Sequence, residues 1–205
     1  MEKNVENRNL KIMILIFFIV LIWSLIRTYS LLTWILEALP AIIMVLVLAL
    51  TYKKHRFSNF VYSVVLVHTI ILLIGAKYTY QRNPLFDYFM ERWGWSRNHY
   101  DRVGHYAQGF TPAIIAKELL LAKGYVKRSK MLYFIVICIV LAIAGVWELI
   151  EFAAVKISGV TSEQVLSTQG DQFDTQWDMI MALLGGLTGL TVFRSIHEKY
   201  IEKIL

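Results

Sequence analysis

The chain has 205 residues, and 57% of them are hydrophobic, more than the roughly 45–50% of a typical soluble domain. The net charge is +6, but no run of basic residues interleaves with aromatic residues, so nucleic acid is not an expected partner. The single cysteine, Cys138, lies in an apolar block and cannot form an internal disulfide. Long apolar blocks separated by short charged stretches therefore favour a polytopic membrane protein, with the lipid bilayer as its surroundings.

Six apolar segments follow one another along the chain, each close to the ~20 residues that a helix needs to cross a bilayer. No alternating ten-residue strand pattern is present, so helices are the expected spanning form. The sequence predicts an all-α fold, a polytopic membrane helix bundle of six transmembrane helices in one integral domain over 1–205. The predicted helices cover about 12–29, 31–51, 59–77, 103–122, 131–153 and 176–194.

Basic residues predict the orientation of these helices. They are concentrated before the first segment, after the sixth, and in the loops that join segments two to three and four to five. All four regions fall on one side of a six-span topology, and positive charge is enriched in cytoplasmic loops. Both termini are therefore expected in the cytoplasm. The longer loops, about 78–100 and 156–174, are expected on the extracytoplasmic side.

The 78–100 loop is rich in aromatic residues. Its stretch Pro84–Trp95 predicts a short helix lying in the membrane interface, with proline at the first turn. An ordinary aromatic belt at the membrane surface is the alternative interpretation, and both are favoured over a substrate-binding role for these aromatic residues.

Three pairs of ionisable residues lie at helix ends that this topology places on the extracytoplasmic side. Spacings of three or four residues put both members of each pair on one helix face. Charged groups at membrane depth are costly and indicate a functional site. The pairs are Asp101 with His105, Glu148 with Glu151, and Asp174 with Asp178.

Small residues continue two of these polar faces along their helices. Gly109 and Ala116 follow His105, and Gly185 and Gly189 follow Asp178. Such stripes let membrane helices approach closely. The stripe beside Glu148 is only one turn long. We therefore expect the last three helices to pack into a core with a polar cap, most closely between the fourth and the sixth.

Carboxylates with an imidazole suit a divalent metal, the one cofactor that the sequence suggests. A metal would relieve repulsion among the acids, and a bound water or a glutamate base would attack a phosphoester or amide. Without a metal, His105 remains a candidate general acid or base. The candidate metal ligands are Asp101, His105, Glu148, Asp174 and Asp178. The candidate catalytic residues are His105, Glu148, Glu151 and Asp178.

A structural interpretation stays open for the same residues. Arg97, Arg102 and Lys156 are near enough in sequence to neutralise some acids, and Asp174 sits where a helix start favours an anion. The helix-start argument does not explain Glu148 and Glu151, because they lie at the C-terminal end of a helix, where its dipole disfavours negative charge.

The order and wording of several motifs resemble the YjdF family of bacterial inner-membrane proteins, from about the third segment onward. This resemblance implies a multi-pass protein of the bacterial plasma membrane and does not imply a particular reaction. The motifs are Gly75-Ala76-Lys77-Tyr78-Thr79-Tyr80, Pro84-Leu85, Arg97 to His105, Trp147-Glu148-Leu149-Ile150-Glu151 and Asp174 to Met179.

A looser resemblance links the chain to VanZ-like membrane proteins, which are associated with glycopeptide-antibiotic resistance. Their Asp-Lys-x-x-His start matches the stretch from Asp101 to His105 with arginine in place of lysine, and Glu148 or Glu151 matches a later glutamate. Asp178 matches a later aspartate of those proteins. The asparagine that usually follows this aspartate is missing here, and Ala182 lies near its place. This resemblance favours the cell envelope as the setting.

Three functions remain open at this point. The first is a membrane-embedded enzyme that acts on a lipid or another envelope substrate at the outer leaflet. The second is an ion-coupled transporter, although transporters usually place their site near the bilayer midplane, where only Glu37 and His68 are candidates. The third is a non-catalytic membrane module whose polar cap serves packing or partner binding.

Overall fold

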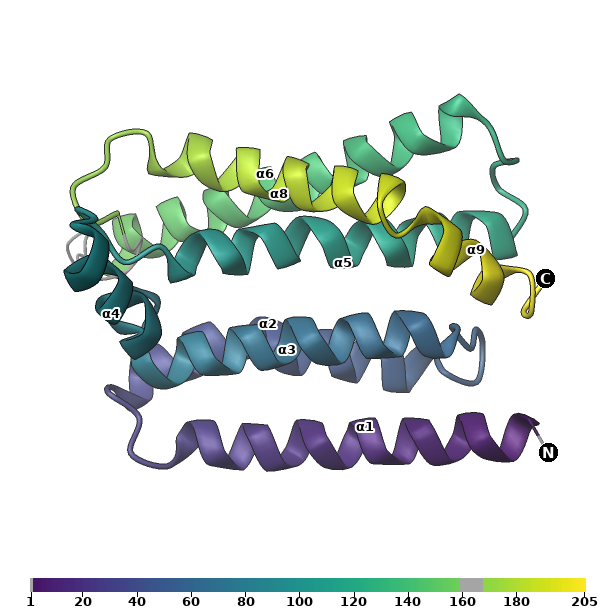
Figure 1. Ribbon diagram of the computed structural model, residues 1–205, viewed down its shortest axis with the longest axis horizontal. Helices are drawn as coiled ribbons and strands as arrows, with labels where there is room; N and C mark the ends of the chain where they lie inside the picture. Colours follow the sequence, from purple (N-terminus) through teal and green to yellow (C-terminus); the bar gives the residue numbers. More distant parts are fainter. Residues whose placement is uncertain (1, 159–167) are drawn as a thin grey trace.

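The computed structural model describes residues 2–158 and 168–205, which form eight α-helices and one 3-10 turn and contain no strand (Figure 1). The all-α prediction is confirmed. The elements are α1 (Glu2–Leu25), α2 (Leu31–Thr51), α3 (Asn59–Tyr78), η1 (Tyr80–Arg82), α4 (Pro84–Trp93), α5 (Tyr100–Ala122), α6 (Lys130–Ser158), α8 (Asp174–Thr191) and α9 (Arg194–Ile201).

Serine side chains define where α2 and α3 begin. The hydroxyl of Ser30 accepts a hydrogen bond from the backbone N–H of Thr33, and Ser58 does the same for Val61. Each bond satisfies one of the N–H groups that have no partner in the first turn of a helix. These caps fix the first residues of α2 and α3, which the apolar pattern alone defines only approximately.

The aromatic loop between α3 and α5 contains η1 and the short helix α4. The side-chain oxygen of Asn83 caps α4 by accepting hydrogen bonds from the backbone N–H groups of Leu85 and Phe86. Pro84 occupies the first helical position. The predicted helix extended to Trp95, whereas α4 ends at Trp93 because Gly94 adopts the left-handed conformation that terminates helices. A location of α4 in the membrane interface stays a prediction.

The helices form two groups that lie along a common axis, α1 to α3 on one side and α5, α6 and α8 on the other (Figure 1). Each group has its own apolar core, around Trp34 and Leu73 in the first and around Val136 and Leu190 in the second. A third cluster joins α3 to α5 through contacts with Ile114. The loop with α4 covers one end of the bundle, and both termini lie at the other.

The closest helix packing occurs between α5 and α8, along the small-residue stripes. A Cβ added to Gly109 would lie well under 3.0 Å from the carbonyl oxygen of Ala182, and one added to Gly185 would meet the carbonyl oxygen of Tyr106 equally closely. At Gly145 in α6 the nearest atom, the Cε of Met179, would be 4.0 Å away. Gly109 and Gly185 therefore let the backbones of α5 and α8 come into contact, because a side chain at either position would not fit. The packing around Gly145 leaves room for a side chain.

Four described helices are long and apolar enough to cross a membrane: α1 from Val5, α2, α3 and α6 as far as Ile157. A fifth span is possible if α8 and α9 count as one, bent by 61°. The hydroxyls of Thr188 and Thr191 bond carbonyls one turn back, an arrangement that bends helices. The predicted sixth segment, which ran straight to 194, is therefore interrupted before Arg194.

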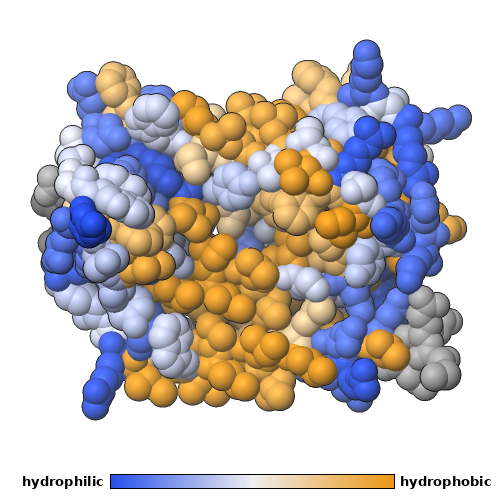
Figure 2. Space-filling view, viewed as in Figure 1, coloured by the Kyte–Doolittle hydropathy of each residue, from blue (hydrophilic) through white to orange (hydrophobic). Residues whose placement is uncertain are grey.

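On the face shown in Figure 2, apolar residues form a broad band across the middle of the molecule, and hydrophilic residues gather at both ends. Many large apolar side chains of α1 and α2 point outward, among them Ile22, Leu32 and Leu50. Such exposure would be unfavourable in water and is expected in contact with lipid tails. The surface thus supports membrane insertion with the helix axes along the bilayer normal.

Candidate functional site

The start of α5 is fixed by the buried Asn98 at the end of the bundle that carries α4. Its side chain accepts a hydrogen bond from the N–H of Tyr100 and donates to Asp87 and to the carbonyl of Asn83. Gln169 bonds both the N–H and the C=O of Asn98. These bonds tie the loops before α4, α5 and α8 together, so the polar residues that open α5 and α8 face each other.

Two buried arginines neutralise the aspartates at the start of α8. Arg97 and Arg102 each place a guanidinium nitrogen 2.6 Å from the same oxygen of Asp174. Arg102 also forms a close ion pair with Asp178, and both arginines lie 3.4 Å from Asp171. The two arginines therefore neutralise some of these acids, as the structural interpretation of the sequence allowed. Asp174 forms ion pairs with both of them.

His105 lies between two carboxylates. Its Nε2 is 3.6 Å from Oδ1 of Asp101 and 3.6 Å from Oδ1 of Asp178. The other ring nitrogen, Nδ1, lies 2.7 Å from the side-chain oxygen of Gln108. Because the side-chain oxygen of Gln108 is an acceptor, Nδ1 donates this hydrogen bond, and Nε2 faces both aspartates.

Glu148 on α6 lies beside His105 and close enough to Asp178 for Coulombic interaction. Its Oε1 is 3.9 Å from Nδ1 of His105, its side chain is only 9% exposed, and no described residue hydrogen-bonds that oxygen. The side chain of Thr175 lies beside the same carboxylate. Glu151 accepts a hydrogen bond of 2.7 Å from the indole of Trp147. Glu148 therefore has an unpartnered oxygen at the site, as does Glu37 on α2.

Asp101, His105 and Asp178 form the one group of described residues whose side chains could ligate a common metal ion. All three are buried, and one ligand atom from each lies within 4.8 Å of the others. Metal bonds of about 2.0–2.2 Å with tetrahedral geometry separate ligand atoms by roughly 3.3–3.6 Å. The two 3.6 Å separations around His105 fit that requirement.

The two remaining predicted ligands lie next to this group and not in it. Asp174 is held by the arginines, and Glu148 faces the outer ring nitrogen of His105. Glu151 lies one helical turn after Glu148 on α6 and hydrogen-bonds the indole of Trp147. The structure thus places the six residues of the three pairs at one end of the bundle but gives them different neighbours.

Three further polar groups come from the other half of the bundle, namely Glu37, His68 and Tyr80. The sequence predicted no role in the site for Tyr80. Glu37 on α2 is close enough to Asp101 for Coulombic interaction, as His68 on α3 is to His105. His68 is 6% exposed, and neither of its ring nitrogens has a hydrogen-bond partner among the described residues. Polar groups of α2 and α3 thus border the cluster from inside.

The ring of Tyr80 is wedged between Gly75 of α3 and Gly104 of α5, where a Cβ at either position would approach it closely. Burial, together with the nearby Glu37 and Asp101, raises the pKa of Tyr80 well above its ordinary value. Its phenol therefore stays protonated and can donate a hydrogen bond. The sequence signal for it was its place in the motif that begins at Gly75.

A groove of about 430 Å³ opens on the outer surface of α5 and α6 beside the cluster. Gln108 and Trp147, which hold His105 and Glu151, are part of its lining. The rest of the lining is apolar and on α6. The lining residues are Gln108, Ile139, Ala142, Ile143, Val146, Trp147 and Ile150.

Fold and surface together define a multi-pass membrane protein with a buried Asp/His/Asp cluster at one end of its bundle. Residues 9–199 match the family described as predicted membrane protein DUF2238. The chain is 40% identical over 185 residues to the inner membrane protein YjdF of Escherichia coli (strain K12), covering 90% of this chain and 88% of that protein. No solved structure matches.

The chain belongs to this DUF2238 family, and its resemblance to YjdF is confirmed. It is a multi-pass protein of the bacterial inner membrane.

Proposed function

We propose that the protein is a membrane-embedded, metal-dependent hydrolase that cleaves the polar head group of a lipid or lipid-linked envelope substrate. The observation that carries the proposal is the buried set of Asp101, His105 and Asp178, with two ligand-atom separations of 3.6 Å. In this proposal both termini are cytoplasmic and the set faces the extracytoplasmic side, as the loop charges predict.

The proposal needs α5 as a sixth span, although α5 is too polar to qualify by composition. With 23 residues it is about 35 Å long, enough for a bilayer core of about 30 Å. Its polar residues are enclosed by neighbouring helices: Arg102, His105 and Lys117 are all buried. Ionisable residues are tolerated in a span when they face the bundle interior, so low hydropathy does not argue against this span.

Electrostatics support a cation at this site. Five carboxylates and two guanidinium groups surround the site. When all seven groups are ionised and the imidazole of His105 is neutral, the site carries three more negative than positive charges. A divalent metal would offset most of this excess. The carboxylates are Asp101, Asp171, Asp174, Asp178 and Glu148, and the cations are Arg97 and Arg102.

The chain's own residues then divide the chemical work. Asp101, His105 and Asp178 would hold the metal, which would supply a polarised water, while Arg102 positions Asp178 through an ion pair to Oδ1, the oxygen that faces His105. Glu148 is the proposed base: it takes a proton from the water whose oxygen bonds to phosphorus or to the carbonyl carbon. The ester or amide bond then breaks, and the leaving atom receives that proton from Glu148.

The groove on α5 and α6 supports an amphiphilic substrate. Ile143, Val146 and Ile150 are 39–56% exposed on the face that meets lipid, so an acyl or prenyl chain could lie there without leaving the bilayer. Gln108, at the polar edge of the groove, also contacts His105. A head group attached to a chain in the groove would thus be near the metal set.

A metal measurement tests the proposal directly. Protein purified without a chelator is expected to contain about one divalent ion per chain by elemental analysis, since three buried ligands suffice for a catalytic site. His105→Ala should lose it, and His55→Ala, which changes a loop histidine, should keep it. Metal absent from the wild type after supplementation with zinc or manganese, or retained fully by His105→Ala, would contradict the metal site.

Glu148→Gln separates catalysis from metal binding. This variant is expected to keep its metal and to release head groups from a total envelope lipid extract at least ~100-fold more slowly, because removal of a general base typically costs that much. Glu91→Gln on the exposed face of α4 is the matched control. Mass spectrometry in ¹⁸O-water should find the label in the wild-type product. An active Glu148→Gln enzyme would remove Glu148 from the proposed mechanism.

An ion-coupled transporter is the second candidate, favoured by the unpartnered His68 halfway along α3 and by its proximity to His105. Between His105 and Glu118, however, α5 carries only two ionisable side chains, Tyr106 next to His105 and Lys117 next to Glu118, so about 16 Å of the helix between them lacks any. A proton path would have to cross this stretch without titratable groups. Proton flux into proteoliposomes under a pH gradient would revive this candidate.

A further inference from the structure

A second polar pocket lies at the opposite end of the bundle, where α6 and α9 begin and both termini are found (Figure 1). Its volume is about 470 Å³, and three of its seven lining residues are basic. The loop charges assign this end to the cytoplasm. The lining consists of Arg128, Ser129, Lys130, Leu132, Tyr133, Arg194 and Glu198.

We propose that this pocket binds the phosphate of an anionic phospholipid of the cytoplasmic leaflet. Basic pockets between helices on that side of a membrane protein favour such head groups, because a phosphate and several cations are complementary in charge and hydrogen bonding. The proposal is independent of the hydrolase site, which lies at the other end of the bundle.

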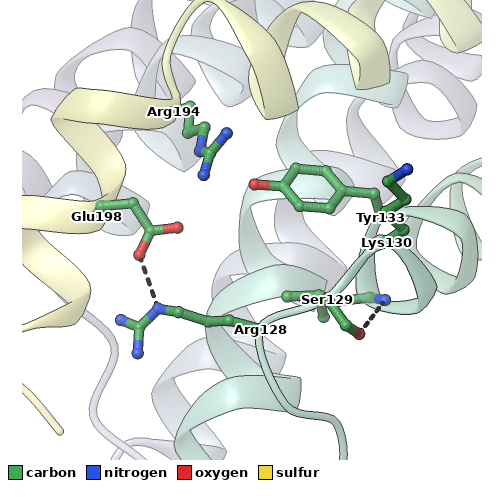
Figure 3. A pocket seen from close by; sticks show the side chains of 7 residues that line it. Arg128, Ser129, Lys130, Tyr133, Arg194 and Glu198 are labelled. Carbon is green, nitrogen blue, oxygen red and sulfur yellow. Dashed lines mark hydrogen bonds and ion pairs between the residues drawn. The ribbon is translucent and has the colours of Figure 1, made fainter.

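Arg194 carries the argument. Its side chain is exposed, and among the described residues it forms no ion pair; its nearest charge-related contact is the ring of Tyr133, 5.8 Å from its guanidinium carbon. Figure 3 shows the guanidinium of Arg194 and the hydroxyl of Tyr133 directed into the same space between α9 and α6. Both groups can donate hydrogen bonds to a phosphate oxygen placed there.

The one acid in the lining does not cancel this positive charge. Glu198 is 2.7 Å from the buried Lys117 and 3.2 Å from Arg128, so its carboxylate is already shared by two cations. These two contacts hold the carboxylate of Glu198 against the two cations. Arg194 and Lys130 are left without an acidic partner in the described part of the chain.

The surroundings select a lipid over a free phosphate. The pocket lies at the first turn of α6, and the next outward-facing side chains of that helix, Met131 and Phe134, are 58% and 65% exposed. They belong to a span that is long and apolar enough to cross the membrane. Acyl chains of a lipid whose phosphate occupied the pocket would lie against these side chains, and inorganic phosphate would gain nothing from them.

Native mass spectrometry of the full-length protein released from detergent micelles tests the inference, with phosphatidylglycerol as the probe. The wild type is expected to retain phosphatidylglycerol, and Arg194→Gln to bind it roughly tenfold more weakly, as for the loss of a charge-assisted hydrogen bond. Lys199→Gln is the matched control, since it removes the same charge from exposed α9 outside the pocket. Arg194→Lys should retain part of the affinity.

Each other result overturns the inference. Equal weakening by Arg194→Gln and Lys199→Gln would mean general attraction of the basic surface for anions. Displacement of the lipid by inorganic phosphate at a similar concentration would mean an anion site without lipid selectivity. Equal retention of uncharged phosphatidylcholine would mean that charge is not recognised. Size-exclusion profiles of the variants, compared with Arg194→Lys, separate loss of binding from loss of folding.

Discussion

Gly109→Ala is expected to disrupt the bundle, at a cost of more than about 3 kcal/mol in free energy of unfolding. The added methyl group would clash with the carbonyl oxygen of Ala182, from which it would lie well under 3.0 Å. Backbone atoms cannot move out of the way as the end of a flexible side chain can. The two helices would have to separate, and the packing that brings Asp101 and His105 to Asp178 would be lost.

Gly145→Ala is the matched control for this prediction. It makes the same substitution in a neighbouring helix, where the nearest atom would be 4.0 Å from the new Cβ. This variant should unfold within about 1 kcal/mol of the wild type, or be slightly more stable, since alanine favours a helix over glycine. Thermal unfolding in detergent is the measurement. Equal melting temperatures for the two variants would contradict the α5–α8 contact.

Arg102→Met is expected to destabilise the protein by about 3–5 kcal/mol, the cost of leaving a buried charge without its partner. Methionine keeps much of the side-chain length and removes the cation that lies between Asp174 and Asp178. Arg102→Lys should be intermediate, because an ammonium group cannot bond two carboxylates with the fixed geometry of a guanidinium.

Two further variants make the Arg102 experiment specific. Arg92→Met changes an exposed arginine on α4 and should alter stability by no more than about 0.5 kcal/mol. Adding Asp178→Asn to Arg102→Met should restore part of the lost stability, since it removes one of the unpaired charges. If the double variant is less stable than Arg102→Met by the full cost of Asp178→Asn alone, the two side chains are not coupled.

The sequence anticipated the close contact of α5 and α8 better than the contacts of α6. Glycines at helical spacing indicate close packing in membrane helices, and Gly109 and Gly185 do lie against the partner backbone. Gly145 has the same residue type on the face of Glu148 but contacts no backbone of another helix. The type and spacing of small residues thus indicate a possible approach, and only the placement of the neighbouring helix determines whether it occurs.

The roles within the polar cluster depended on the tertiary structure. Spacing put Asp174 and Asp178 on one face of one helix, and nothing in that spacing distinguishes a carboxylate held by two arginines from one beside an imidazole. Loop bonds of Asn98 and Gln169 settle the difference, because they place Arg97 next to Asp174. Tyr80 and its contacts with Gly75 and Gly104 likewise join helices that are distant in sequence.

By itself the sequence determined that this protein is helical and inserted in a membrane, because backbone hydrogen bonding and hydrophobic length restrict a chain of this composition to spanning helices. It also determined that acids and a histidine gather at one end of the bundle. Only the tertiary structure decided that Asp101 and Asp178 face His105, that Asp174 pairs with two arginines, and that α8 bends before Arg194. Those outcomes depend on distances between side chains of different helices, which periodicity along one helix does not contain.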